Sequence, residues 1–464
     1  MMSHRFNTFL IALLLLLLAA PSPAIACPFC NAVSQTLRQE MEAMDTVVIA
    51  TAMQSDAQRD KESGEVEMKV THVLKGSELV SVGQTVNATY YGVVKAGRTF
   101  MLSGVDPPDL QWSCLPLSDR AKKYVIDFTK LEDDDLARLK FFQKFLEDEE
   151  TMLARDAYDE FATAPYTAIK GLKPDMDHDQ LVKWIGDTEM GADRKRLYLT
   201  MLGVCGTEKD LPLLEDIMSS TQKSSRSGLD ALIACYLTLA GEKGLPLINE
   251  LFLANKKAPY ADTYAAIMAV RFHGTEGDVI ARSALIESLH HVLERKDLAD
   301  LVIPDLARWG DWSQVDRLVE LFAKADKDNN WVRVPVVNYL RACPLPSGEE
   351  ALKKLEKIDP ESVRRANTFF SIPIPAKDTG SSNSSNVRKS EHRFVSIPVV
   401  SSSSGPTASS RQPIAAGTPV ATISGESPSN PWTLVYVVGM GLATIMIMQF
   451  LLLSGGAAPD EVSA

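Results

Sequence analysis

The sequence predicts a multidomain α and β protein: a small N-terminal β barrel, an α-solenoid of helix pairs, a disordered linker and a C-terminal transmembrane helix. Three observations predict this order. Hydrophobicity alternates as in strands near the N-terminus, a helical repeat follows, and apolar runs lie at both ends. The expected segments are residues 1–26 (signal peptide), 27–126 (β domain), 127–360 (α-solenoid), 371–431 (linker), 432–453 (transmembrane helix) and 454–464 (short tail).

The first 26 residues have the pattern of a secretory signal peptide. His4 and Arg5 precede the apolar run Phe9–Ala20, and Ala24-Ile25-Ala26 has the small-x-small pattern of a cleavage site. We therefore expect cleavage before Cys27 and export of the body. A retained N-terminal anchor is the alternative, but the run is shorter than the ~20 residues that a membrane span needs.

The C-terminal apolar run, Trp432–Leu453, carries no charge and is long enough to cross a bilayer. Trp432 and Tyr436 would lie near one membrane interface. The Ser- and Pro-rich stretch before it predicts a disordered tether. The sequence thus predicts a single-pass protein of the cell membrane, with its body on the periplasmic or extracellular side. The tail has no Lys or Arg, so this orientation depends on the signal peptide alone.

Composition limits the classes of partner. The 464 residues carry a net charge of −12 and no long basic block, which argues against nucleic acid as a partner. Six cysteines are too few for a disulfide-dense scaffold. A chain of this length has room for two or three domains.

The β domain is predicted from short alternating stretches rich in β-branched and aromatic residues. These stretches are Thr46–Met53, Val66–Gly76, Gln84–Tyr91 and Arg98–Val105, with turn-rich pieces between them. Four or five strands at this spacing before Leu117 suggest a small barrel or sandwich.

The helical region contains an internal repeat. Its units align on Gly206, Gly241, Gly274, Gly310 and Pro344, at steps of 35, 33, 36 and 34 residues. Each unit reads as helix, turn, helix, and we expect the glycines to end the first helix in the left-handed conformation. Such a repeat predicts an α-solenoid, because no single unit can bury its apolar face alone. Ala137–Tyr166 would begin the stack; a plain globular helical domain is the alternative.

The cysteine pair in Cys27-Pro28-Phe29-Cys30 admits several interpretations. It could be a redox pair, but such a motif normally follows a buried strand. Structural zinc would need a second pair of ligands, and only Cys114 is close in sequence. Lipidation of Cys27 is another alternative, although Ala24 departs from the usual lipobox.

A disulfide is the favoured interpretation of this pair. In an oxidising compartment Cys114 could bond to Cys27 or Cys30, or Cys27 and Cys30 could bond to each other. The sequence does not rank these pairings, so all three residues are disulfide candidates.

Two family resemblances follow from these segments. Residues Cys27–Leu117 resemble the netrin and tissue-inhibitor-of-metalloproteinases type of OB barrel. The resemblance rests on the N-terminal cysteines and on the stretches "VSQTLRQEMEAM", "DTVVIATA" and "VTHVLKG…VGQTV…GRTFML". Its spacing, Cys-x-x-Cys in place of Cys-x-Cys, departs from that family. The resemblance implies an OB-like barrel and protease inhibition through the free amine and carbonyl of Cys27. Ala137–Ile358 resembles HEAT repeats, and the whole chain resembles bacterial membrane-anchored HEAT-like repeat proteins.

Motifs for other chemistry are incomplete. Asp175, Asp177 and Asp179 have a calcium-loop spacing. However, Gln180 stands where a Gly is required and Gly186 where a bidentate Glu is needed, so helix capping by Asp177 or Asp179 is the better interpretation. His290-His291 with Glu294 lacks the second His of a metalloprotease helix. We therefore expect no metal site, cofactor or catalytic set.

The predicted function is that of a non-enzymatic, membrane-anchored extracytoplasmic protein that binds a protein partner through its solenoid. Two alternatives remain open: a thiol-disulfide oxidoreductase that uses Cys27 and Cys30, and a protease inhibitor that acts through Cys27.

Overall fold

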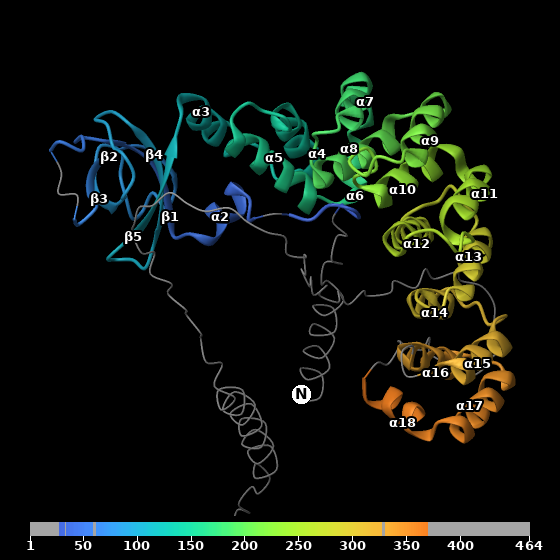
Figure 1. Ribbon diagram of the computed structural model, residues 1–464. Coiled ribbons are helices and arrows are strands. Elements are labelled where there is room, and N and C mark those ends of the chain that lie inside the picture. Colours follow the sequence, from blue (N-terminus) through green and yellow to red (C-terminus); the bar gives the residue numbers. More distant parts are fainter. Residues whose placement is uncertain (1–26, 33, 59–61, 327–329, 370–464) are drawn as a thin grey trace, which may run out of the picture. The chain divides into compact units, whose positions relative to one another are not determined.

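The computed structural model describes residues 27–32, 34–58, 62–326 and 330–369, all within one compact unit (Figure 1). The predicted signal peptide, linker, transmembrane helix and tail lie outside the described residues.

The β domain is one antiparallel sheet of five strands in the order β3-β2-β1-β4-β5. The strands are β1 (Thr46–Ala52), β2 (Glu65–Lys75), β3 (Thr85–Thr89), β4 (Thr99–Val105) and β5 (Gln111–Leu117). The sheet curls so that its edge strands β3 and β5 come into contact, which makes it a half-barrel. Four strands match the predicted stretches to within two residues at each end, because alternation and turn residues mark them clearly.

The two faces of the sheet serve two hydrophobic cores. Val48, Ala50 and Phe100 face the hollow of the curl and form a core within the β domain. Val47 and Met101 face the other way and join the core of the helical region. This follows from the period-two alternation of a strand that is buried on both sides.

Two helices flank the sheet in sequence. Helix α2 (Leu37–Ala43) precedes β1 and begins with a capping box, in which Thr36 and Gln39 exchange side-chain to backbone hydrogen bonds. Helix α3 (Asp119–Phe128) follows β5, and the Ser118 side chain accepts a hydrogen bond from the Ala121 N–H.

The helical region is a succession of helix pairs. Its helices are α4 (Asp135–Phe142), α5 (Thr151–Thr163), α6 (Tyr166–Gly171), α7 (His178–Gly186), α8 (Ala192–Cys205), α9 (Leu211–Ser219), α10 (Leu229–Ala240), α11 (Leu245–Ile248, continued by a π-helical turn at Asn249–Leu253), α12 (Tyr260–Thr275), α13 (Arg282–His290), α14 (Ala299–Arg308), α15 (Val315–Lys324), α16 (Arg333–Ala342), α17 (Pro346–Ile358) and α18 (Pro360–Phe369). Helix α10 packs between α8 and α12, and α16 packs between α14 and α18. Neighbouring first helices therefore stack, as the repeat predicts.

The predicted repeat turns all fall at the end of a first helix, but not all for the predicted reason. Gly241 and Gly310 have φ of 64° and 73°, the left-handed conformation that we expected. The expectation is wrong for Gly206, whose φ is −70°, and for Gly274, which lies inside α12. At Gly274 a Cβ atom would lie 2.1 Å from the Trp309 ring, so close packing requires glycine there. Pro344 follows α16.

Among the described helices, the continuous run Leu229–Leu253 is long and apolar enough to cross a membrane by composition. Its most apolar window is 56% buried within the helix stack. A core helix of a repeat array has the same composition.

Candidate functional site

The described N-terminal residues 27–32 and 34–36, here called the arm, begin with a disulfide between Cys27 and Cys30. Their Cα atoms lie 5.3 Å apart, and the Cys30 N–H donates to the Cys27 carbonyl across the turn. Cys114 lies on β5 as a free, half-buried thiol, and burial raises its pKa to about 11. Of the pairings that the sequence left open, the structure contains Cys27–Cys30.

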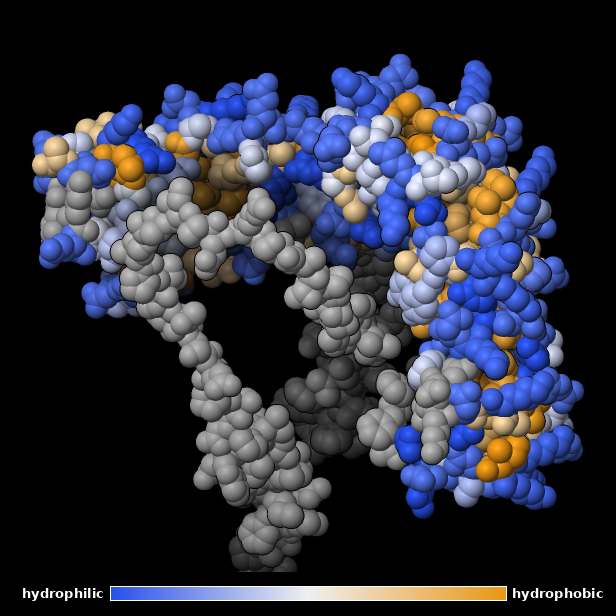
Figure 2. Space-filling view, viewed as in Figure 1, coloured by the Kyte–Doolittle hydropathy of each residue, from blue (hydrophilic) through white to orange (hydrophobic). Residues whose placement is uncertain are grey.

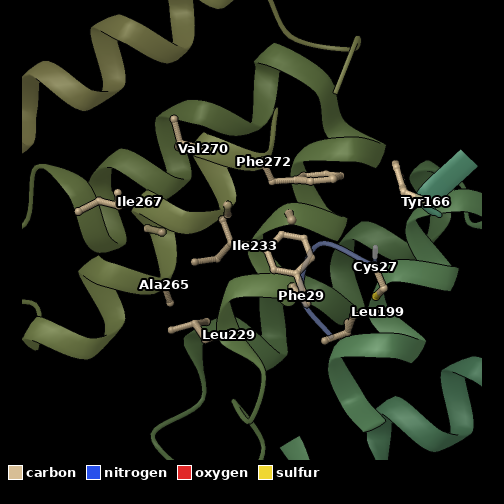
Figure 3. Close-up of a cluster of buried hydrophobic side chains, with 14 of the residues drawn as sticks. Cys27, Phe29, Tyr166, Leu199, Leu229, Ile233, Ala265, Ile267, Val270 and Phe272 are labelled. Carbon is tan, nitrogen blue, oxygen red and sulfur yellow. The ribbon is translucent and has the colours of Figure 1, made fainter. Parts of the chain in front are cut away.

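Phe29 anchors the arm on the helix stack. Its side chain is 8% exposed, and its ring centroid lies 5.1 Å from that of Phe272 on α12. Tyr166 also packs on Phe272 in an edge-on arrangement, and Cys27 belongs to the same buried cluster as Leu199 of α8 (Figure 3). The arm therefore reaches helices that are distant from it in sequence, and Phe29 completes their apolar core.

Polar side chains of α5 bind the rest of the arm. The Tyr158 hydroxyl donates to the Asn31 carbonyl (3.2 Å), and the Ser34 hydroxyl donates to Asp159 (2.9 Å). The Leu37 N–H, at the start of α2, donates to Asp156 (2.7 Å). One helix thus holds successive points of the arm, and this orders the chain that leads into the sheet.

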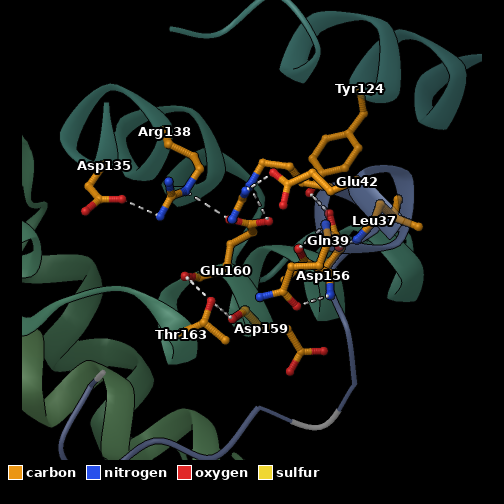
Figure 4. A network of polar contacts seen from close by, with 12 residues as sticks. Leu37, Gln39, Glu42, Tyr124, Asp135, Arg138, Asp156, Asp159, Glu160 and Thr163 are labelled. Atoms are coloured by element: carbon orange, nitrogen blue, oxygen red, sulfur yellow. Dashed lines mark hydrogen bonds and ion pairs between the residues drawn. The ribbon is translucent and has the colours of Figure 1, made fainter. Parts of the chain in front are cut away.

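A buried carboxylate, Glu160, lies next to these contacts and bridges α2 and α4. Arg38 Nε lies 3.4 Å from one of its oxygens, and Arg138 Nε lies 3.1 Å from the other (Figure 4). Because Glu160 is fully buried, removing either arginine would leave an incompletely paired charge in the core.

Asp156 is the second buried carboxylate of this network. It accepts hydrogen bonds from the Leu37 N–H and from the Tyr124 hydroxyl (2.6 Å) of α3. Burial raises its pKa to about 6 against the opposing effect of these two donors. The network therefore joins α2, α3 and α5 around groups that would be costly to leave unpaired.

Two cavities adjoin these contacts. The larger, about 430 Å³, lies where α2, the end of β2, α3 and α4 meet, and both Arg38 and Arg138 line it. The smaller, about 230 Å³, lies beside the arm's anchor, where Tyr166 and Phe272 line it together with Lys170, Lys173, Glu276 and Asp278.

His273 also lines the smaller cavity. Its Nε2 donates to the Ala234 carbonyl (3.0 Å), since a carbonyl can only accept, and this fixes the neutral tautomer. Burial lowers its pKa to about 4. A histidine held neutral in this way is suited to packing between helices rather than to proton transfer near neutral pH.

The other sequence motifs have structural roles. Asp177 caps α7 by accepting from the Gln180 N–H (3.0 Å), which confirms its interpretation as a helix cap. His290 contacts Asp311 at 2.7 Å and joins two helix pairs. Within the described residues, no group of three or more His, Cys, Asp or Glu side chains is placed to hold a metal ion.

No protein-family model matches the chain, and no curated protein or solved structure is significantly similar to it. The arm's contacts on α5 and α12 join residues that are distant in sequence. The sequence analysis did not single out Asp156, Asp159 and Glu160 of α5, although apolar residues flank them in "ARDAYDEFA". That mixture of acids and apolar residues on every side of one helix was the available signal.

Proposed function

We propose that this protein is a non-enzymatic extracytoplasmic scaffold that binds a protein partner along its helix pairs. One observation carries the proposal: the pairs stack on one another and leave a series of turns exposed, at Glu242 and Val279 among others. Extended stacks of this kind offer repeated, similar surfaces to a partner. On the face of the helical region that Figure 2 displays, apolar side chains lie among hydrophilic ones.

The finer fold assignments belong to this proposal. A sheet in the order β3-β2-β1-β4-β5, with β3 touching β5, supports an OB-like barrel. Stacked first helices support HEAT-like repeats. A disulfide at Cys27–Cys30 supports an oxidising compartment, and thus export after cleavage before Cys27, with residues 432–453 as the membrane anchor.

The two alternative functions depend on Cys27. An inhibitor that chelates a protease zinc through this residue would need its amine and carbonyl to be accessible, but Cys27 is 3% exposed against the helix stack. An oxidoreductase would need a reactive thiolate in a partly exposed, electropositive site. The burial of Cys27 weighs against both.

Photo-crosslinking tests the scaffold directly. The full chain, in membranes of its own cells, would carry a photo-crosslinking amino acid at Glu242 or Val279, in adjacent exposed turns, or at the control Val93, 64% exposed in the β domain. We expect both turn positions to capture the same protein and Val93 not to capture it. Different proteins at the two turns, or equal capture from Val93, would overturn the proposal.

Thiol alkylation of the same cells distinguishes the redox alternative. A scaffold should keep Cys27 and Cys30 bonded in nearly every molecule, with Cys114 alkylated. A substantial pool of reduced Cys27 and Cys30 that is oxidised again after a pulse of reductant would favour the oxidoreductase.

A further inference from the structure

The larger cavity, here called the junction cavity, has walls of three chemical kinds. We propose that it is a binding site for a small zwitterion with an apolar side chain, namely an aliphatic amino acid or short peptide with free termini. Its volume of about 430 Å³ falls within the range of small-molecule sites, roughly 300–1,000 Å³.

The floor of the cavity is apolar. Met41 and Leu74 contribute from α2 and β2, and Phe128, Leu131 and Phe142 contribute from α3, the loop after it and α4. Met41, Phe128 and Phe142 are buried, so this floor is fixed by the surrounding core. Such a surface gains free energy by covering an aliphatic side chain.

Arg38 and Arg138 supply the cationic wall. Each uses Nε on the single carboxylate of Glu160 and one terminal nitrogen on a partly exposed carboxylate, Glu42 or Asp135. Two guanidinium groups thus share one buried carboxylate, and the two arginines line the cavity from α2 and α4. A ligand carboxylate is the group that such donors bind best.

Lys75 lines the same cavity but does not add to this wall. Its Nζ donates to the Met41 and Glu42 carbonyls at 3.1 and 2.8 Å, at the carboxyl end of α2. The capacity to bind an anion therefore comes from the arginines.

Three acidic residues line the cavity: Glu42, which pairs with Arg38, and Glu132 and Asp133, which supply the anionic wall. Glu132 and Asp133 lie in the loop between α3 and α4 and are exposed. Their charges would repel a ligand that is only anionic, and they suit an ammonium group. A zwitterion satisfies both charged walls at once, whereas a phosphate or a simple fatty acid satisfies only the arginines.

Calorimetric titration of the purified full chain tests the proposal with ligands that differ by one group. The probe is the dipeptide Leu-Leu; its comparators are N-acetyl-Leu-Leu, Leu-Leu-amide and Ser-Ser. We expect Leu-Leu to bind and each comparator to bind about tenfold more weakly or worse, since each loses one charged contact or the apolar one. Free leucine distinguishes the two classes of ligand. If leucine binds as tightly as Leu-Leu, the ligand is a free amino acid, and if it binds more weakly, the ligand is a peptide.

Variants connect the binding to this cavity. Leu131→Trp should fill it and abolish binding of Leu-Leu, with the circular dichroism spectrum unchanged. Glu132→Gln with Asp133→Asn, both at exposed positions, should weaken Leu-Leu but leave N-acetyl-Leu-Leu unchanged. Lys140→Gln, on α4 but paired with Asp175 outside the cavity, is the matched control and should bind normally.

Several results would overturn the proposal. The first is that Leu-Leu does not bind at about 10 mM. The second is that a capped peptide binds as tightly as Leu-Leu. The third is that the folded Leu131→Trp protein binds Leu-Leu as tightly as the parent protein does. If Leu131→Trp fails to fold, the Glu132/Asp133 double variant decides the matter through the difference between capped and free peptides.

Discussion

Phe29→Ala should release the arm from the helix stack. The Phe29 side chain is more than nine-tenths buried, and an aromatic side chain buried in this way removes about 150–250 Å² from water, which stabilises by about 4–6 kcal/mol at ~25 cal/mol per Å². The alanine side chain keeps a small part of this buried area, and the ring contact with Phe272 is lost as well. We expect docking to weaken by about 3 kcal/mol, which is about a hundredfold in the equilibrium between docked and free arm.

Hydrogen exchange followed by mass spectrometry measures this change. The Leu37 N–H, which Asp156 holds, and the amides before it should exchange about a hundredfold faster in Phe29→Ala. Peptides from α14 to α18 should exchange as in the parent protein. Val93→Ala, at an exposed site of the β domain, serves as the control and should leave the arm unchanged. Unaltered exchange of the arm in Phe29→Ala would refute the anchoring role of Phe29.

Three further predictions concern stability. Burial raises the pKa of Asp156 from 3.8 to about 6, so its contribution to the free energy of unfolding is present below pH 4 and is lost as the pH rises through about 6. The loss is up to about 3 kcal/mol, and urea unfolding midpoints measured against pH should no longer show it in Asp156→Asn. An unchanged pH dependence in that variant would contradict the prediction. For His273, whose pKa is lowered from 6.5 to about 4, stability changes with pH in the opposite direction: up to about 3 kcal/mol is present above pH 6.5 and is lost as the pH falls towards 4. The same urea midpoints, measured for His273→Gln, should not show this loss at low pH. Gly274→Ala should lower the free energy of unfolding by about 1–3 kcal/mol, because the new Cβ atom would clash with Trp309. The control Gly186→Ala, where a Cβ atom meets open space, should be neutral or stabilising. Equal effects of the two substitutions would show that the contact at Gly274 is easily relieved.

Local patterns in the sequence predicted most of the elements. Alternation located β1 to β4, and repeat spacing located the turns at Gly241 and Gly310, because both signals arise from neighbouring residues. Gly274 followed the same spacing for a different reason, its contact with Trp309 from the next pair. Spacing alone does not distinguish a left-handed turn from close helix packing.

Contacts distant in sequence could not be predicted in the same way. Phe29 meets Phe272 only after the helix pairs have stacked, and nothing near either residue marks the partnership. The choice of Cys27–Cys30 over Cys114 also depends on tertiary structure, since β5 holds Cys114 in the sheet. Nothing near Glu160 in the sequence marks Arg38 and Arg138 as its partners, and only their approach makes its burial tolerable.

The path of the arm along α5 is the central claim, and photo-crosslinking from Asn31 tests it most directly. Asn31 is exposed, so a benzophenone amino acid fits there, while its carbonyl accepts from Tyr158 on α5. We expect irradiation of the purified full chain to link this position to α5 or α8 within the same molecule. Crosslinks from Asn31 mainly to strands of the β domain, or none within the chain, would contradict a docked arm.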